Sequence, residues 1–171
     1  MTANAPPSSH LGLFIQGTRV PLVTASVLPA ILVVVWAWRG GLPIAWGMAA
    51  LAVAGVFFLH LGANTITDYF DWDESDRFNP YATPFNGGVR HALEAVITRR
   101  TLLVLTVVCW TAALLAGVIL VTGGRPKVLW MGLARGVVGA LYSMAPFSFQ
   151  KRGLVEVLVC FGFVPLITLG M

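Results

Sequence analysis

Stretches of 19 or more residues that contain at most one charged side chain make up most of this sequence. Five of them follow one another: Val20–Trp38, Leu42–Thr67, Thr101–Gly124, Val128–Phe149 and Gly153–Met171. About 20 helical residues cross a hydrocarbon core of ~30 Å. Their apolarity is continuous rather than alternating, which favours helices over a β-barrel. The sequence therefore predicts an all-α, polytopic transmembrane helix bundle of about five spans.

The composition excludes a soluble domain of this length. Only 11% of the residues are charged and 57% are hydrophobic, whereas roughly a quarter are charged in an average globular domain. A net charge of +4 could indicate nucleic-acid binding, but the basic residues lie in short segments between apolar runs, so we expect membrane lipid and no nucleic acid as a partner. Cys109 and Cys160 lie inside apolar runs, and we expect both to be buried thiols.

The polar segments predict the orientation in the membrane. Six of the seven acidic residues lie in the long segment from Asp68 to Arg100. Seven basic residues flank the spans on the side of this segment and three on the other side, which predicts a cytoplasmic-membrane protein whose acidic loop faces the cytoplasm. Residues 1–17 are expected to form a polar N-terminal tail and residues 18–171 a membrane domain.

An acidic cluster lies where the second span ends. Asn64, Asp68 and Asp71 are separated by four and then three residues, so one helical face would carry all three. Carboxylates crowded at a helix C-terminus repel one another and the helix dipole. Clustered oxygen ligands bind Mg²⁺ or Ca²⁺. A solvated connecting loop is the plainer alternative, and a calcium EF-hand is excluded because Asp76 and Ala82 replace its glycine and its last glutamate.

Several motifs together resemble the UbiA-type membrane prenyltransferases. Asn64-x-x-x-Asp68-Tyr69-Phe70-Asp71, followed by Asp76-Arg77, is similar to the first aspartate-rich motif of that family. Three further segments resemble the menaquinone branch of that family, the 1,4-dihydroxy-2-naphthoate polyprenyltransferases: Pro84-Phe85-Asn86-Gly87-Gly88-Val89-Arg90, Leu141-Tyr142-Ser143-Met144-Ala145-Pro146-Phe147 and Lys151-Arg152-Gly153-Leu154-Val155-Glu156. The resemblance covers roughly residues 18–171. Thr67 stands where relatives commonly have Asn, and the spacing from Asp71 to Asp76 is longer by one.

The resemblance implies a Mg²⁺-dependent transfer of a polyprenyl group from its diphosphate to an aromatic acceptor such as 1,4-dihydroxy-2-naphthoate. It implies Asp68 and Asp71 as catalytic residues, with Asn64, Asp68, Asp71 and Asp76 as metal ligands. It implies that the diphosphate is bound by Asn64, Arg77, Arg90, Lys151 and Arg152. Tyr69 and Tyr142 would lie beside the prenyl group and the aromatic ring, where aromatic faces stabilise developing positive charge.

The family fold has about nine transmembrane helices and a second aspartate motif in its second half. This chain has one acidic cluster and ends in the fifth span. We therefore expect a prenyltransferase domain truncated at its C-terminus, an N-terminal half for which a separate C-terminal half is a candidate partner. Two rivals stay open: a catalytically inactive membrane fragment or cation-binding scaffold, and a membrane phosphotransferase acting on nucleotide-activated alcohols.

Two ionisable residues inside the spans are expected to face other helices. Arg135 in the fourth span should point into the bundle, because a cation at mid-membrane costs about 2.5–3.5 kcal/mol on insertion scales. It would either contact substrate or pair structurally. His60 lies one turn before Asn64 on the same face, and we expect it to form an interhelical hydrogen bond rather than to act in catalysis.

Overall fold

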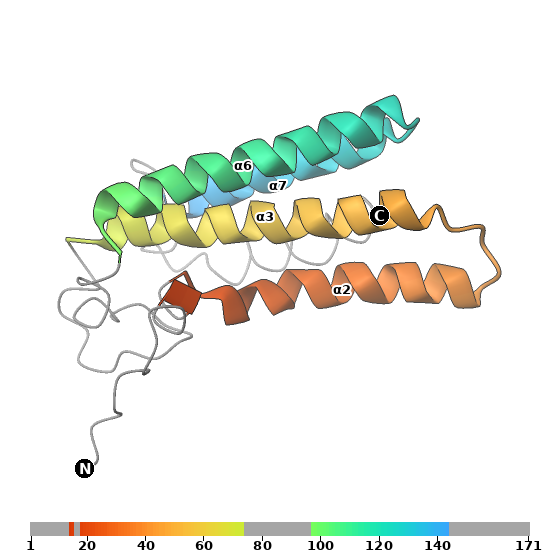
Figure 1. The fold of residues 1–171 in the computed structure, drawn as a ribbon, viewed down its shortest axis with the longest axis horizontal. Helices are drawn as coiled ribbons and strands as arrows, with labels where there is room; N and C mark the ends of the chain where they lie inside the picture. Colours follow the sequence, from red (N-terminus) through yellow and green to blue (C-terminus); the bar gives the residue numbers. More distant parts are fainter. Residues whose placement is uncertain (1–13, 16–17, 74–96, 144–171) are drawn as a thin grey trace, which may run out of the picture.

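A computed structural model describes residues 14–15, 18–73 and 97–143, and this part of the chain is helical with no strand. Its four long helices are α2 (Val20–Arg39), α3 (Trp46–Asp71), α6 (Arg99–Thr122) and α7 (Pro126–Ser143). They lie lengthwise side by side, and each runs antiparallel to the one before it (Figure 1). The predicted all-α fold is confirmed for this part, whereas the fifth predicted span, the tail before residue 14 and most of the acidic loop lie outside it.

Local sequence sets most of the helix boundaries. The α6 helix begins after Thr98, whose side chain accepts a hydrogen bond from the backbone N–H of Thr101 at 3.2 Å, as an N-cap residue does. Gly41 and Gly124 end the turns after α2 and α6, and their φ angles of 77° and 83° lie in the left-handed region that glycine adopts without strain.

The second span differs from its predicted bounds at both ends. The α3 helix begins at Trp46 rather than Leu42, and residues 42–45 are not helical; Pro43 accounts for this at Leu42, since it disfavours helical geometry at the residue before it. At the other end the helix continues through the first acidic residues to Asp71. The acidic cluster is therefore part of the helix itself, as the spacing of Asn64, Asp68 and Asp71 requires.

Small residues allow the helices to approach one another closely. The α3 helix contacts α2, α6 and α7. A Cβ atom on Gly62 would lie 2.3 Å from the Trp110 ring of α6, and one on Gly139 of α7 would lie 3.4 Å from the Cβ of Ala63. Close approach over Gly and Ala is the usual way in which helices associate in lipid.

The α2, α3 and α6 helices are long and apolar enough to cross a membrane. The outward faces of α2 and α6 expose large apolar side chains, which suits contact with lipid: Leu28, Ile31, Leu32, Val104, Val107, Val108, Leu115 and Ile119. The α7 helix is also present as predicted, but it carries Lys127 and Arg135 and does not belong to this set. The described part therefore contains three helices whose length and apolarity suit a membrane-embedded protein.

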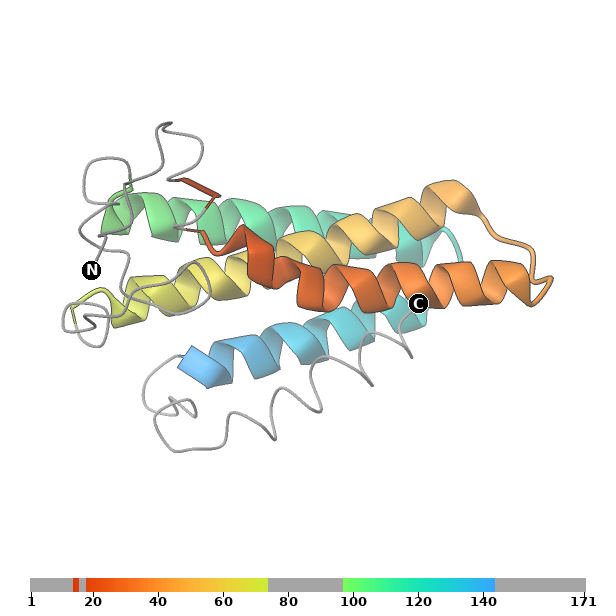
Figure 2. The same cartoon turned by 90° about the horizontal axis from the view of Figure 1, so that it is seen from below.

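The two ends of the bundle, which lie at the left and right of Figure 2, differ in the residues that they carry. One end joins the start of α2, the C-terminal end of α3 and the start of α6, and it carries the acidic residues. The other end holds the two glycine turns and exposes four tryptophans, Trp36, Trp38, Trp46 and Trp130. Tryptophan gathers at membrane–water interfaces, so this second end has the character of a membrane boundary.

Candidate functional site

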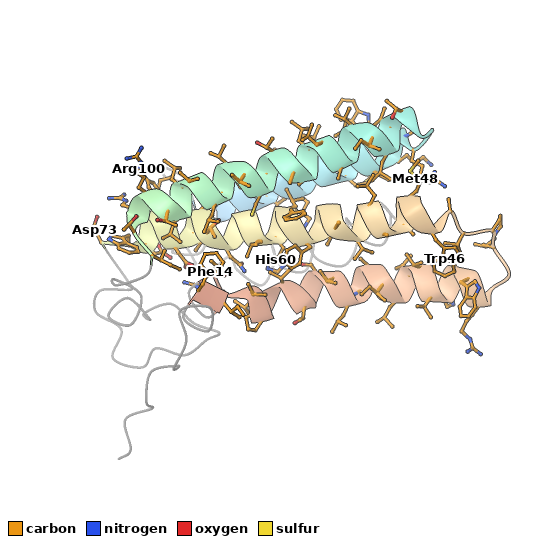
Figure 3. The ribbon with its side chains drawn as sticks, in the orientation of Figure 1. Phe14, Trp46, Met48, His60, Asp73 and Arg100 are labelled. Carbon is orange, nitrogen blue, oxygen red and sulfur yellow. The ribbon has the colours of Figure 1, made fainter. Side chains whose placement is uncertain are left out.

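A polar stripe runs along the last three turns of α3. His60, Asn64 and Asp68 repeat every four residues, and Thr67 and Asp71 lie beside them on the same side. Asp68 and Asp71 are only 7% and 6% exposed, and His60 is 6% exposed. In Figure 3 His60 lies where α3 faces α2. Carboxylates are rarely buried without a partner, so this end of α3 is organised around charged groups.

Arg19 joins the start of α2 to the acidic part of the stripe. Its guanidinium forms an ion pair with the Asp68 carboxylate. Its backbone carbonyl accepts a hydrogen bond from Asn64 Nδ2 at 3.3 Å. Arg19 has a left-handed backbone with a φ of 51°, which non-glycine residues adopt mostly where surrounding contacts hold them. Asn64 and Asp68 thus fix one end of α2 against α3.

At the inner end of the stripe, one serine links three helices. Ser26 of α2 forms a hydrogen bond with His60 Nδ1 of α3. Arg135 of α7 donates from Nη2 to the same Ser26 hydroxyl at 2.6 Å. Because arginine only donates, Ser26 accepts this bond and keeps its own hydrogen for a second one. His60 also interacts with the Asn64 side chain. The interhelical hydrogen bond expected of His60 is therefore present, and Arg135 reaches into the bundle as expected.

Tyr69 lies on a different side of α3 from the polar stripe. The Arg99 guanidinium of α6 lies over its ring, 4.5 Å from the centroid. Tyr69 also packs against the buried pair Ile97 and Leu102. Asp73 forms a 2.9 Å ion pair with Arg99 in which both side chains are largely exposed. In this arrangement Tyr69 contributes to the contact between α3 and α6.

The predicted site residues divide into two groups. Asn64, Asp68, Asp71 and Tyr69 lie at one end of α3 within the described residues. The other predicted site residues, or at least their side chains, lie outside the part of the chain that the structure describes: Asp76, Arg77, Arg90, Tyr142, Lys151 and Arg152. Their predicted roles stay predictions. Asn64 and Asp68 are brought together on Arg19, and Asp71 is buried one turn further along.

Sequence reasoning did not single out Arg19 or Ser26 as site residues. Arg19 counted only toward the orientation of the chain, although it directly precedes the first span. A basic residue at that position is the available signal, because an up-and-down bundle brings the start of its first helix to the end of its second. Ser26 is a small polar residue inside an apolar span, and such residues hydrogen-bond between membrane helices.

The donor set was tested for its fit to a magnesium ion. Two buried carboxylates and an amide on successive turns are hard oxygen ligands of the kind that Mg²⁺ binds. In residues 14–15, 18–73 and 97–143, no three carboxylate, imidazole or thiol side chains form a ready metal site. The fourth predicted ligand, Asp76, lies outside these residues. In chemical character, Asn64, Asp68 and Asp71 fit part of a site that further ligands, such as diphosphate oxygens, would complete.

No family model, no curated protein and no solved structure matches this sequence.

Proposed function

We propose that this chain supplies the first aspartate cluster of a UbiA-type membrane prenyltransferase, which transfers a polyprenyl group from its diphosphate to an aromatic quinone precursor. The observation that carries the proposal is the buried acidic face at the end of α3, where Asp68 and Asp71 are 7% and 6% exposed. Two acidic groups at the end of a membrane-length helix suit a ligand that is itself charged and chelates a metal. The motifs around Gly87, Tyr142 and Arg152 favour 1,4-dihydroxy-2-naphthoate as acceptor.

The residues of this chain would bind and orient the diphosphate. A bound Mg²⁺ would neutralise the negative charge of the leaving diphosphate. Asp68, Asp71 and Asn64 would hold that ion from one side, and Arg19 fixes the Asp68 carboxylate at the start of α2. Arg77, Arg90, Lys151 and Arg152 would bind diphosphate oxygens. Burial strengthens these interactions because less water competes with them.

The proposal includes an arrangement in the membrane. We place the acidic end at the cytoplasmic face of the cytoplasmic membrane, because basic residues are more numerous on that side of the spans, seven against three. We also propose five spans in this chain, forming half of a nine-helix bundle. The tryptophan-rich end described above would then lie at the opposite face.

A transfer assay tests the proposal. Membranes containing the chain, alone and with any in-frame continuation or partner half, are supplied with a radiolabelled polyprenyl diphosphate and 1,4-dihydroxy-2-naphthoate. We expect a labelled, magnesium-dependent product that disappears with EDTA and with Asp68→Ala. A complete protein that transfers no prenyl group to any quinone precursor would refute the assignment.

A second candidate is a membrane scaffold without catalysis. It is favoured by the ion pairs Arg19–Asp68 and Arg99–Asp73, which compensate two of the carboxylates without any metal. The two candidates differ in how they take up magnesium. Magnesium binding that depends on a prenyl diphosphate supports the transferase, whereas binding that is indifferent to the diphosphate, or absent, supports the scaffold.

A further inference from the structure

An apolar cavity lies between α3, α6 and α7, away from the acidic end. Its volume is about 380 Å³. Its walls come from Ala52–Leu59 of α3, Trp110–Leu120 of α6 and Val128–Val137 of α7. The segment of α3 that lines it ends at Leu59, which is more than one helical turn before Asn64, the first of the candidate metal and diphosphate ligands. The cavity is therefore separate from the candidate diphosphate site.

The cavity opens toward the lipid-facing side of the bundle. Three residues line the cavity and also have exposed side chains: Leu114 of α6, and Leu133 and Val137 of α7. These three side chains belong to the facing sides of α6 and α7, so the opening lies between these helices. Apolar cavities of this kind do not hold water readily, and around a membrane-embedded bundle the medium would be hydrocarbon. Its occupant is expected to come from the bilayer.

The length of the cavity matches one leaflet. Its wall on α7 covers Val128 to Val137, which is about 14 Å at 1.5 Å per helical residue. Half of a ~30 Å hydrocarbon core is about the same length. Arg135 lies near the inner end of this wall, but its guanidinium donates to Ser26 on α2. The charge is thus directed toward α2.

Two cations lie at the outer end of the cavity. The backbone N–H of Arg125 donates to the carbonyl of Leu120 at 2.9 Å, and the N–H of Val128 donates to the Arg125 carbonyl at 3.3 Å. Leu120 and Val128 both line the cavity, so Arg125 adjoins its end directly. Lys127 follows two residues later, and both side chains are exposed. The sequence from Arg99 to Ser143 contains no acidic residue, so this rim is positively charged.

We propose that this cavity binds an acyl chain of an anionic phospholipid whose phosphate is held by Arg125 and Lys127. The apolar walls accommodate the chain, and the two cations lie where a headgroup would lie when the chain is inside one leaflet. Arginine and lysine side chains bind the phosphate group of an anionic lipid by charge-assisted hydrogen bonds. The exposed Trp130 at the same end is an interfacial residue by position and type. The site is independent of the proposed transferase activity, because it needs neither the diphosphate nor the acidic face of α3.

Lipid titration of the purified full-length chain tests this site. The chain is delipidated in a neutral detergent, and phosphatidylglycerol carrying brominated acyl chains is added. Bromine quenches tryptophan fluorescence on contact, and Trp110 lies in the cavity wall. Phosphatidylcholine with the same chains is the comparison lipid. We expect phosphatidylglycerol to give saturable quenching at a concentration at least about tenfold lower than the concentration of phosphatidylcholine that is needed.

Two pairs of variants locate the binding. Gly132 lines the cavity and has open space where a Cβ would lie, so Gly132→Leu fills the cavity, while Gly47→Leu makes the same change at an equally open position outside it. Removing both rim cations with R125Q/K127Q should weaken phosphatidylglycerol binding about tenfold to 30-fold. Arg39→Gln removes an exposed cation at the same end of the bundle, on α2, and should leave binding unchanged.

The outcomes are distinct. Loss of saturable quenching in Gly132→Leu and weaker phosphatidylglycerol binding in R125Q/K127Q, with both controls retained, support the site, whereas unchanged binding in R125Q/K127Q overturns the assignment of the phosphate to Arg125 and Lys127. Equal binding of the two lipids overturns the choice of an anionic headgroup, and unchanged binding in Gly132→Leu overturns the cavity as the site. If Gly132→Leu does not fold, comparing the two lipids on the wild-type chain and on R125Q/K127Q still decides whether Arg125 and Lys127 hold an anionic lipid.

Discussion

Removing one partner of the Arg19–Asp68 ion pair should destabilise the bundle strongly, and removing both should destabilise it much less. The side chains of Arg19 and Asp68 are 17% and 9% exposed. Breaking a buried pair by removing one partner costs about 3–5 kcal/mol, because the other charge is left buried. Arg19→Gln should cost about 3 kcal/mol, the lower limit of that range, because both side chains are partly exposed. It is the more costly of the two single variants, because it leaves the more buried partner, Asp68, without its counter-ion. Asp68→Asn should cost less, because the Arg19 side chain is more exposed and can hydrate.

The double variant R19Q/D68N leaves two neutral polar groups in place of the pair. Its free energy of unfolding should therefore exceed that expected from adding the two single losses, with a coupling of about 1–3 kcal/mol. The exposed pair Arg99–Asp73 is the matched control, with side chains 44% and 60% exposed. Its coupling should be about 0.2–1 kcal/mol and should fall with added salt, whereas that of Arg19–Asp68 should persist.

Reversible unfolding in mixed micelles, followed by circular dichroism, measures both cycles. Additive losses in the Arg19–Asp68 cycle, or a coupling no larger than that of Arg99–Asp73, would refute the reasoning that this pair is a buried contact between α2 and α3.

Two further predictions concern helix packing. Gly62→Ala should destabilise the fold by about 1–3 kcal/mol, because the added Cβ would lie 2.3 Å from the Trp110 ring. The control is Gly132→Ala, whose Cβ would meet nothing within 4 Å. This control should be neutral or should stabilise the fold by up to about 1 kcal/mol. Equal effects in the same unfolding assay would contradict the contact. Ser26→Ala should cost about 1–3 kcal/mol, since it removes a buried hydroxyl that forms hydrogen bonds with residues of two other helices. The control is Thr24→Ala, whose exposed hydroxyl bonds only within its own helix. This control should change the stability by less than about 0.5 kcal/mol.

The features that depend on one helix could be predicted from the sequence. The spacing of Asn64, Asp68 and Asp71 predicts a shared helical face without reference to any other helix, and α3 carries all three. The apolar runs likewise predict helices near the observed α2 and α6. The observed start of α3 lies four residues after the predicted one, because an apolar run predicts where hydrophobic residues occur and not where the helical backbone begins.

The features that depend on packing could not be predicted. The pairing of Arg19 with Asp68 joins residues 49 positions apart and requires α2 and α3 to lie in one rotational setting. Periodicity fixes the face of a helix, but it does not determine which neighbour that face meets. The same holds for Ser26, which became part of the site only through its bonds to His60 and Arg135.

The proposed function requires the buried acidic face of α3 to bind a magnesium-chelated prenyl diphosphate. The most direct measurement is calorimetric titration of the purified chain with farnesyl diphosphate, with and without Mg²⁺, in wild type and in the variants Asp71→Asn and Asp73→Asn. Asp71 is 6% exposed within the stripe, and Asp73 lies two residues later in an exposed ion pair. We expect magnesium-dependent binding that Asp71→Asn weakens at least about tenfold and that Asp73→Asn leaves unchanged. Binding that does not need magnesium, or that both variants affect equally, would contradict it.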